Sequence, residues 1–216
     1  MDKDICKRLL RDADLNVAPF ITLTKVNKDQ ISFENVKETL GLPVFIKPAS
    51  EGSSVGVSKV FDNEGYHSAL DIAFQHGNKI IIEQGINGRE IECAISGNDY
   101  PKASVCGEVI LNNEFYSYHK KYLSANSTKT EVPASLTPEI QAKIQKVAIQ
   151  AYQALSCTGM ARVDVFLTES GEVIINEINT LPGFPNISMY PKLQEASGIS
   201  YSDLITHLIN LALEKK

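Results

Sequence analysis

The feature that most constrains the fold is a pair of Val- and Ile-rich runs in the last third of the chain. Residues 162–168 and 173–179 flank the short break 169–172, Glu-Ser-Gly-Glu, and this pattern predicts a β-hairpin. Side chains alternate along a strand, so residues paired across the hairpin share one face of the sheet. The expected pairs are Thr168 with Val173, Asp164 with Glu177, and Arg162 with Asn179.

Two carboxylates would meet on this face. Asp164 and Glu177, held side by side, would repel, and one of them would normally stay protonated. Mg²⁺ removes that conflict, because it takes carboxylate and amide oxygens, such as that of Asn179, and shares its remaining positions with phosphates. A solvated face on which Arg162 balances the acids explains the same residues, and the hairpin alone does not separate the two interpretations.

The composition is that of an ordinary globular protein. With 216 residues, 43% hydrophobic and 22% charged, the chain can bury a core as one domain or as two small lobes. A net charge of −5 without a Lys/Arg cluster argues against nucleic acid as a partner. We expect no membrane partner, because no apolar run approaches a span and no signal peptide opens the chain. Scattered cysteines without a C-x-x-C pair favour reduced thiols in a cytoplasmic protein: Cys6, Cys93, Cys106 and Cys157.

A loop rich in Gly and Ser follows a short apolar strand that ends at Lys47. In residues 49–57, Ala-Ser-Glu-Gly-Ser-Ser-Val-Gly-Val, the small side chains let backbone N–H groups point into one concavity that suits a phosphate. Ser53 and Ser54 add hydroxyl donors. This is not a Walker loop, because no Gly-Lys-Ser/Thr follows. Residues 57–60 look like a returning strand, so a plain hairpin turn is the alternative; the preceding lysine favours phosphate binding.

The other periodic segments predict alternating helices and strands. Helices are expected at 4–14, at 33–40, at 63–76, from Thr137 up to Gly159, and as a last pair after Ser188. Strands are expected at 17–22, 42–48, 57–60, 79–83, 89–96 and 104–110. The first helix should bury Ile5, Leu9 and Leu10 and leave Lys3, Lys7 and Arg8 in solvent. The last should bury Leu204, Ile205, Leu208, Leu211 and Ala212.

Two further stretches have features of a ligand site. An acid at a strand end, such as Glu83, usually faces solvent, but in a nucleotide cleft it would accept from an exocyclic amine or a ribose hydroxyl. Glu90 and Glu92 share one face of the next strand. Residues 111–123 are aromatic and basic and precede the polar run 124–130, which suits a mobile lid over a site. A disordered surface loop fits that composition nearly as well.

Four motifs taken together resemble the ATP-grasp superfamily and, within it, the D-alanine–D-alanine ligase family. They are Ile-Lys-Pro-Ala-x-Glu-Gly-Ser-Ser-Val-Gly-Val at 46–57, Ile-Glu-Gln at 82–84, Arg-Val-Asp at 162–164 and Asn-Glu-Ile-Asn-Thr-Leu-Pro-Gly-Phe at 176–184. The resemblance runs from Met1 to Lys216. It implies an α+β fold of two lobes, each on a mainly antiparallel sheet, with ATP between them. The implied parts are a small lobe at 1–90 and a large lobe at 91–216, with a lid at 111–132 and the metal-binding hairpin at 162–179.

The resemblance also implies roles for individual residues. ATP phosphates would be held by Lys3, Lys47, Ser53, Ser54 and, from the lid, Lys121. The rest of the nucleotide would contact Glu83, Gln84, Gly85, Ile86, Glu90 and Asn176. Two Mg²⁺ ions, or Mn²⁺ in their place, would be bound by Asp164, Glu177 and Asn179. The catalytic residues would be Arg162, Ser53, Tyr122 and Lys121, and substrate would lie at Tyr122, Arg162, Gly183 and Ser188.

The implied activity is the ATP-dependent joining of two D-alanines for peptidoglycan precursor synthesis. The carboxylate of the first D-alanine attacks the γ-phosphate, which gives an acyl phosphate and ADP. The amine of the second D-alanine then attacks that carbonyl and expels phosphate. Mg²⁺, Lys and Arg would neutralise charge and align the reactants, with Arg162 stabilising the oxyanion, and the closed lid would exclude water.

Two departures from the family pattern bear on this chain. The family has an additional N-terminal domain that nothing here matches. We therefore expect a piece of a longer enzyme, commonly a homodimer, that binds nucleotide weakly and has little ligase activity alone. Phe184 is followed by Pro185 where the family usually has Thr, and the fixed φ and missing N–H of proline could shift Ser188.

Three other functions stay open. D-Alanine–D-lactate ligases carry a His in the lid and lack the Lys-Tyr pair, whereas this chain has His119 but also Lys121 and Tyr122, which favours the dipeptide. Another ATP-grasp carboxylate–amine ligase would share the ATP and Mg²⁺ residues but not this lid. A non-catalytic nucleotide-binding module would not need Arg162, because binding ATP requires no oxyanion donor.

Overall fold

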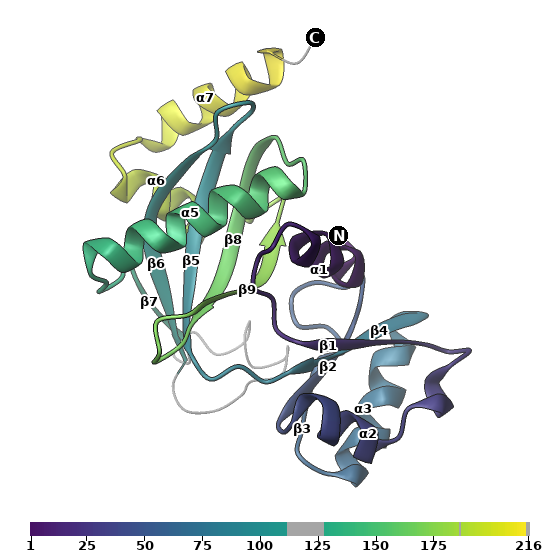
Figure 1. Cartoon of the computed structure of the whole chain (residues 1–216). Coiled ribbons are helices and arrows are strands. Elements are labelled where there is room, and N and C mark those ends of the chain that lie inside the picture. Colours follow the sequence, from purple (N-terminus) through teal and green to yellow (C-terminus); the bar gives the residue numbers. More distant parts are fainter. Residues whose placement is uncertain (112–127, 186, 215–216) are drawn as a thin grey trace. The chain divides into compact units, whose positions relative to one another are not determined.

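The computed structural model describes residues 1–111, 128–185 and 187–214 (Figure 1). The chain forms two compact units. Unit 1 consists of Met1–Arg8, Ala18–Ile86 and Leu111–Thr128, and unit 2 of Leu9–Val17, Asn87–Ile110 and Lys129–Lys216. Each unit is built on one antiparallel sheet with helices, which confirms the expected α+β class. The division into lobes at 1–90 and 91–216 stays a prediction. In the structure the segment Leu9–Val17 belongs to unit 2, although it lies within residues 1–90.

The sheet of unit 1 has four strands in the order β1-β4-β2-β3. The strands are β1 (Phe20–Thr24), β2 (Val44–Pro48), β3 (Ser58–Val60) and β4 (Lys79–Gln84). One face packs against α2 (Phe33–Leu40) and α3 (Asn63–Gln75), and the short 3-10 helix η1 (Lys28–Gln30) precedes α2 (Figure 1). The side chain of Ser32 caps α2 by accepting the Asn35 N–H at 3.2 Å, and Gly41 ends the helix as predicted, with a φ of 71°.

Alternation along the central strands separates the core of unit 1 from a charged face. Ile46 and Ile82 are buried in the cluster formed with α2 and α3. Lys47 and Glu83, one residue further on in each strand, lie on the opposite face. Lys47 pairs with Ile81, two residues before Glu83, so the lysine and the glutamate are diagonal neighbours on that face.

The first helix, α1 (Lys3–Asp12), buries charged residues together with apolar ones; Leu10 is buried as predicted, at 1% exposed. Ile5 and Leu9 are 53% and 47% exposed, whereas Asp4 and Lys7 are only 6% and 3% exposed. The expectation that Ile5 and Leu9 are buried and Lys7 solvated was therefore wrong. The physical reason is that the charged face of unit 1 supplies ion-pair partners for Asp4 and Lys7, and these pairs decide which side of the helix turns inward.

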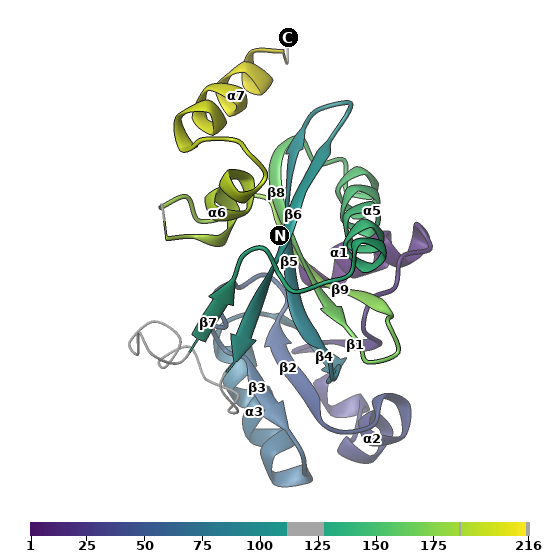
Figure 2. The same cartoon turned by 90° about the vertical axis from the view of Figure 1, so that its left-hand side faces the viewer.

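Unit 2 contains a five-stranded sheet in the order β7-β6-β5-β8-β9. The strands are β5 (Arg89–Gly97), β6 (Lys102–Leu111), β7 (Thr128–Glu131), β8 (Gly159–Leu167) and β9 (Val173–Asn179). One face packs against α5 (Pro138–Ala154), and the other against α6 (Met189–Ala196) and α7 (Tyr201–Glu214) (Figure 2). The lid at 111–132 stays a prediction: Leu111 ends β6, Thr128–Glu131 form β7, and residues 112–127 lie outside the described residues.

Helix α5 begins as the sequence predicts and ends earlier. The side chain of Thr137 caps it by accepting the Ile140 N–H at 3.4 Å, and Pro138 occupies the first turn. The helix stops at Ala154, so Gly159 begins strand β8 rather than ending α5.

The last helix, α7, is buried along a narrower side than expected. Leu204 and Leu211 are buried, but Ile205 is 39% exposed and Ala212 is exposed as well, so the prediction for these two was wrong. The helix rests on α6, β5 and β8 with one side only, which leaves the neighbouring apolar positions in solvent. In the described part of the chain, no helix combines the length and the apolar character needed to cross a bilayer.

The hairpin of β8 and β9 has the expected pairing at its polar positions and a different one at its tip. The observed pairs include Arg162 with Asn179, Asp164 with Glu177, Val165 with Ile175, and Leu167 with Val173. Thr168 does not face Val173, because its N–H closes the turn by donating to the Glu172 carbonyl at 3.0 Å. Asn176 is the extra residue of a β-bulge, which brings Glu177 onto the face of Asp164 although Ile175 faces the core.

Candidate active site

Three carboxylates line up across neighbouring strands of unit 2. Glu92 on β5 pairs with Asp164 on β8, which pairs in turn with Glu177 on β9. Residues opposite each other on antiparallel strands share a face, so the three side chains form one row. Asp164 is 9% exposed, and the other two are half-buried. A row of half-buried acids requires positive charge nearby.

Arg162 supplies one positive charge to this carboxylate row. Its Nε and Nη2 donate to the two oxygens of Asp164 at 2.7 Å each, and Nε lies 3.1 Å from Oε2 of Glu92. Burial alone would lower the pKa of Arg162, but the hydrogen bonds to Asp164 and the charges of Asp164, Glu92 and Glu177 raise it above its ordinary value. Within the described residues the side chain of Glu177 makes no hydrogen bond or ion pair, and its charge acts on Arg162 of the same cluster.

The carboxylate row fits a divalent cation in both charge and donor type. Asp164, Glu177 and Asn179 offer carboxylate and amide oxygens, which are the donors that Mg²⁺ prefers. The oxygens of Asp164 accept from Arg162, and Oδ1 of Asn179 accepts the Leu181 N–H at 3.1 Å. A carboxylate or amide oxygen has two lone pairs, so accepting one N–H does not prevent it from binding a metal. No three His, Cys, Asp or Glu side chains of the described chain gather closely enough to hold a metal by themselves. Other oxygens, such as those of a phosphate, would have to complete the shell.

The loop after β9 brings Gly183 and Ser188 together. A Cβ on Gly183 would lie 3.2 Å from Oγ of Ser188. Ser188 precedes α6 as its N-cap residue without using its side chain as a cap, and its N–H donates to the Pro185 carbonyl at 2.8 Å. The loop is tied to α7, since the hydroxyl of Tyr201 donates to the Phe184 carbonyl at 3.0 Å. The Ser188 hydroxyl therefore stands at a helix N-terminus, close to the backbone of Gly183.

The charged face of unit 1 carries a buried triad of Lys7, Glu83 and Lys47. Each lysine forms an ion pair with one oxygen of Glu83, which is 4% exposed. Burial alone would raise the pKa of Glu83, but the charges and hydrogen bonds of Lys47 and Lys7 lower it below its ordinary value. Burial and the charge of Lys47 lower the pKa of Lys7 despite the attraction of Glu83. Glu83 is thus an ionised carboxylate in a net positive cluster, and not the solvent-facing acid usual at a strand end.

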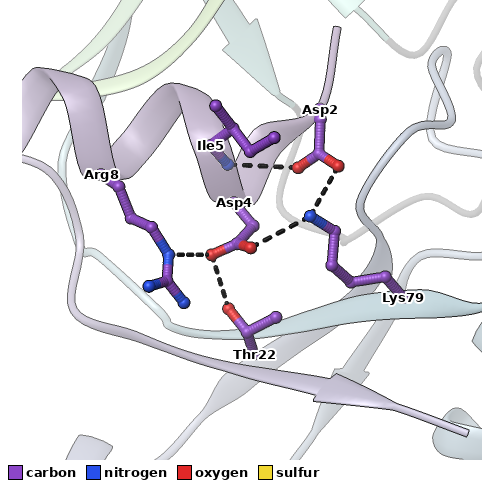
Figure 3. Close-up of polar contacts among 6 residues, drawn as sticks. All are labelled: Asp2, Asp4, Ile5, Arg8, Thr22 and Lys79. Carbon is purple, nitrogen blue, oxygen red and sulfur yellow. Dashed lines mark hydrogen bonds and ion pairs between the residues drawn. The ribbon is translucent and has the colours of Figure 1, made fainter.

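A second polar network fixes the start of α1 on the sheet of unit 1 (Figure 3). The carboxylate of Asp4 accepts from Arg8 Nε at 2.6 Å, Thr22 Oγ1 at 2.8 Å and Lys79 Nζ at 3.0 Å. Lys79 also pairs with Asp2 at 2.7 Å. These contacts hold the start of α1 against β1 and β4, and with it Lys3 and, one turn later, Lys7.

The Gly/Ser-rich loop has the backbone of an anion-binding turn. Ser53, Ser54 and Gly56 have φ values of 52°, 61° and 68°, a left-handed conformation that is unfavourable for serine. Lys3 is held at the start of this segment, since its N–H donates to the Ala49 carbonyl at 2.8 Å and its ammonium to the Glu51 carbonyl. Successive left-handed residues turn backbone N–H groups into one concavity, which is the geometry expected of a phosphate loop.

The segment after β4 is partly committed to internal hydrogen bonds. The N–H of Gln84 donates to the Pro19 carbonyl and that of Gly85 to the Pro43 carbonyl, both at 2.9 Å. A Cβ on Gly85 would lie 2.7 Å from the same Pro43 oxygen, so a larger residue would not fit there. Among the described residues the N–H of Ile86 has no partner, and it is the donor that this segment can offer to a base.

The predicted site residues fall into two sets, each described within its own unit. Unit 1 holds Lys3, Lys47, Ser53, Ser54, Glu83, Gln84, Gly85 and Ile86. Unit 2 holds Glu90, Arg162, Asp164, Asn176, Glu177, Asn179, Gly183 and Ser188. Lys121 and Tyr122 lie outside the described residues.

Two charged residues without a predicted role join these sets. Lys7 pairs with Glu83, and Glu92 extends the carboxylate row beside Arg162. Their spacing was the available signal: Lys7 follows Lys3 by one helical turn, and Glu92 lies on the same strand face as Glu90.

Comparison with known proteins places this arrangement in a family. Residues 9–210 match a family model described as D-ala D-ala ligase C-terminus. D-Alanine–D-alanine ligase A of Escherichia coli (strain K12) is 63% identical over 215 residues, which is 100% of this chain and 59% of that protein. The VanG D-Ala:D-Ser ligase structure from Enterococcus faecalis matches with a TM-score of 0.90 and 37% identity, over 98% of this chain and 61% of that one. The D-alanine–D-alanine ligase of Bacillus anthracis complexed with ATP matches with a TM-score of 0.82 and 31% identity, over 99% of this chain and 66% of that one.

The chain therefore spans 59% of the length of the E. coli relative. Its two antiparallel sheets with their helices form the ATP-grasp fold of the matching structures, as the motifs predicted. Because the family model covers residues 9–210 of the 216, the chain belongs to the D-alanine–D-alanine ligase family.

Proposed function

We propose that the protein containing this chain joins two D-alanines in a reaction that consumes Mg-ATP and passes through an acyl phosphate, for peptidoglycan precursor synthesis. The observation that carries the proposal is the row Glu92, Asp164 and Glu177 on one face of the sheet, with Arg162 beside it. Such a row of carboxylates would bind a divalent metal whose remaining oxygen ligands come from a triphosphate. The 63% identity to a D-alanine–D-alanine ligase supports the choice of substrate.

At the carboxylate row, Asp164, Glu177 and Asn179 would hold Mg²⁺ or Mn²⁺. The metal would bridge the phosphates and neutralise charge on the group being transferred. Arg162 uses Nε and one N–H of Nη2 on Asp164, which leaves Nη1 and the second N–H of Nη2 as donors. We assign these donors to the oxyanion of the tetrahedral intermediate, where preorganised positive charge lowers the barrier most.

On the charged face of unit 1, the residues would bind the nucleotide. Lys3, Lys47 and the backbone of the Ser53–Gly56 loop would hold the phosphates. The ionised Glu83 can only accept hydrogen bonds, which suits the exocyclic amine of adenine, and the N–H of Ile86 would donate to the base. Glu90 is assigned to the ribose, and Asn176 to the ATP side of the metal-binding hairpin.

The proposed acceptor is a second D-alanine beside Gly183 and Ser188. The D-Ala:D-Ser ligase of Enterococcus faecalis is 37% identical to this chain, against 63% for the E. coli D-alanine–D-alanine ligase. The motif Lys121-Tyr122 favours D-alanine over D-lactate, and we assign Lys121 to the γ-phosphate and Tyr122 to the closed substrate site.

Two further features belong to the same proposal. The longer enzyme would be a homodimer. A cytoplasmic location is supported by the cysteines, all of which are free thiols.

Calorimetric titration of the chain with ATP, in the presence of Mg²⁺ or of EDTA, tests the metal part. We expect Mg²⁺ to tighten binding, and Glu177→Gln to weaken Mg-ATP binding about tenfold, because one ionic ligand is lost. Glu172→Gln is the matched control, since it removes an exposed carboxylate from the same hairpin and should change nothing. Equal affinity with Mg²⁺ and with EDTA would refute the metal site.

Phosphate release separates a ligase from a binding module. We expect the protein containing this chain to release phosphate from Mg-ATP only when D-alanine is present. Binding of Mg-ATP without any phosphate release, with D-alanine, D-serine or D-lactate as acceptor, would favour a non-catalytic module.

A further inference from the structure

We propose that Lys7 is a positioning residue that acts as the resident counter-ion of Glu83 and so releases Lys47 to the nucleotide. The inference rests on the proposed function, because it takes Lys47 as a phosphate ligand. Its basis is the buried triad of unit 1, in which Glu83 has two lysine partners rather than one. Lys7 is outside the motifs that indicate the nucleotide site, and burial sets it apart from the neighbouring cations of α1.

The two lysines of the triad differ in their freedom to move. Lys7 is 3% exposed and is enclosed between β4 and the ring of Phe20, whose centroid lies 5.9 Å from its ammonium. The side chain of Lys47 is 12% exposed and therefore reaches solvent from the same face. Lys7 cannot move from Glu83 into solvent unless α1 moves as well, whereas the side chain of Lys47 can rotate away from Glu83.

Electrostatics makes the second lysine necessary. A buried carboxylate that loses its cationic partner is left with an uncompensated charge, which is strongly unfavourable. If Lys47 were the sole partner of Glu83, its departure to a phosphate would leave such a carboxylate behind. With Lys7 in place, one ion pair remains, and the Glu83 carboxylate stays ionised while Lys47 contacts the nucleotide.

The placement of α1 supports a specific role for Lys7. Asp4 pairs with Lys79 at the start of β4, and Lys7 pairs with Glu83 near the end of the same strand. The charges are reversed at the two ends, so a helix lying in the opposite direction would set acid against acid and lysine against lysine. The network of Figure 3 therefore fixes the direction of α1, and that direction delivers Lys7 to Glu83.

Calorimetric titration of the intact chain with Mg-ATP tests the inference. We expect Lys7→Met to weaken binding about tenfold, because Lys47 then remains locked on Glu83. Lys7→Arg, which keeps a buried cation, should stay within about threefold of the unsubstituted chain. Lys37→Met is the matched control: it makes the same substitution on α2 of the same unit, at a side chain that is 52% exposed, and should leave binding unchanged.

A second pair of variants separates this role from a structural one. With Glu83→Gln the lock on Lys47 is gone, so adding Lys7→Met should cause no further loss of Mg-ATP affinity. The comparison also serves if Lys7→Met alone fails to fold, because the double variant removes both charges of the pair.

Each outcome decides the matter. Unchanged affinity in a folded Lys7→Met chain, or a further tenfold loss on adding Lys7→Met to Glu83→Gln, would overturn the proposal, and the latter would make Lys7 a direct ligand. Absence of Mg-ATP binding by the unsubstituted chain would instead remove the proposed function itself, and this inference with it.

Discussion

Replacement of Asp4 by Asn tests whether charge, rather than the burial of apolar side chains, holds the start of α1 on the sheet of unit 1. The substitution keeps the size and shape of the side chain, which is 6% exposed. It removes the negative charge and turns an N–H₂ group toward donors. In the structure those donors are Arg8, Thr22 and Lys79, all within 3.0 Å of the carboxylate (Figure 3).

The expected loss of stability for Asp4→Asn is about 3 kcal/mol. Hydrogen bonds that involve a charged group contribute roughly 1.5–3 kcal/mol each when buried. Arg8 adds little, because its side chain is 58% exposed and exposed pairs contribute about 0–1 kcal/mol. The estimate therefore rests on Thr22 and Lys79. For a chain of this size it corresponds to a fall in Tm of roughly 6–12 °C.

Urea denaturation followed by far-ultraviolet circular dichroism, at pH 7 and at lower pH, measures this effect. Burial alone would raise the pKa of Asp4, but the hydrogen bonds from Arg8, Thr22 and Lys79 and the charge of Lys79 lower it below its ordinary value. A depressed folded pKa gives stability that is present above the unfolded pKa, about 3.9, and lost as the pH falls through the folded pKa. The difference between Asp4→Asn and the parent should thus be full at pH 7 and shrink below about pH 4.

Two results would refute the reasoning about Asp4. Equal stability of variant and parent at pH 7 would mean that apolar contacts hold α1 in place. An undiminished difference at low pH would mean that the N–H₂ group of asparagine facing other donors destabilises the variant, and that the lost charge does not.

Two further predictions concern the phosphate loop and the thiols. Gly56→Ala should destabilise the chain by about 2 kcal/mol and weaken Mg-ATP binding, because φ is 68° and the new Cβ would lie 2.9 Å from His76 and Pro48. Gly52→Ala is the control, since a Cβ at Gly52 would meet nothing within 4 Å. Equal melting temperatures and equal Mg-ATP affinities for the two variants would contradict the prediction. A disulfide reagent such as dithionitrobenzoate should react with Cys157 in the native chain and with all four cysteines in urea, since the other three are buried. Burial raises the pKa of the Cys157 thiol, so its reaction should be slow at neutral pH and accelerate as the pH rises; rapid labelling of two thiols at pH 7 would show that the core opens.

Local patterns in the sequence were sufficient where one signal dominated. Helix α2 has its predicted bounds, because a serine cap and a terminal glycine mark both ends. The hairpin pairs Asp164 with Glu177 as expected, yet the expected tip was wrong. The turn is longer by a residue and the bulge at Asn176 compensates for it, so two deviations cancel. A period of two residues carries no information about an inserted residue.

The sequence did not reveal which charged residues pair with each other in the folded structure. Hydrophobic spacing in α1 selected Ile5 and Leu9 for burial, while the structure buries Asp4 and Lys7. The partners of these residues, Lys79 and Glu83, lie more than seventy positions away along the chain, and no local pattern connects them. The role proposed for Lys7 follows only from the folded structure, in which Lys7 of α1 pairs with Glu83 of β4.

The bulge at Asn176 has a consequence for changes in chain length. It lets a single strand serve the hydrophobic interior in its first half and polar chemistry in its second. Deleting this residue would leave Ile175 opposite Val165 and Glu177 opposite Asp164, so every side chain would keep its side. Loss of a residue elsewhere in β9 would invert all the positions beyond it. The hairpin thus contains one position at which a residue can be lost without moving apolar side chains to the polar face or charged side chains into the core.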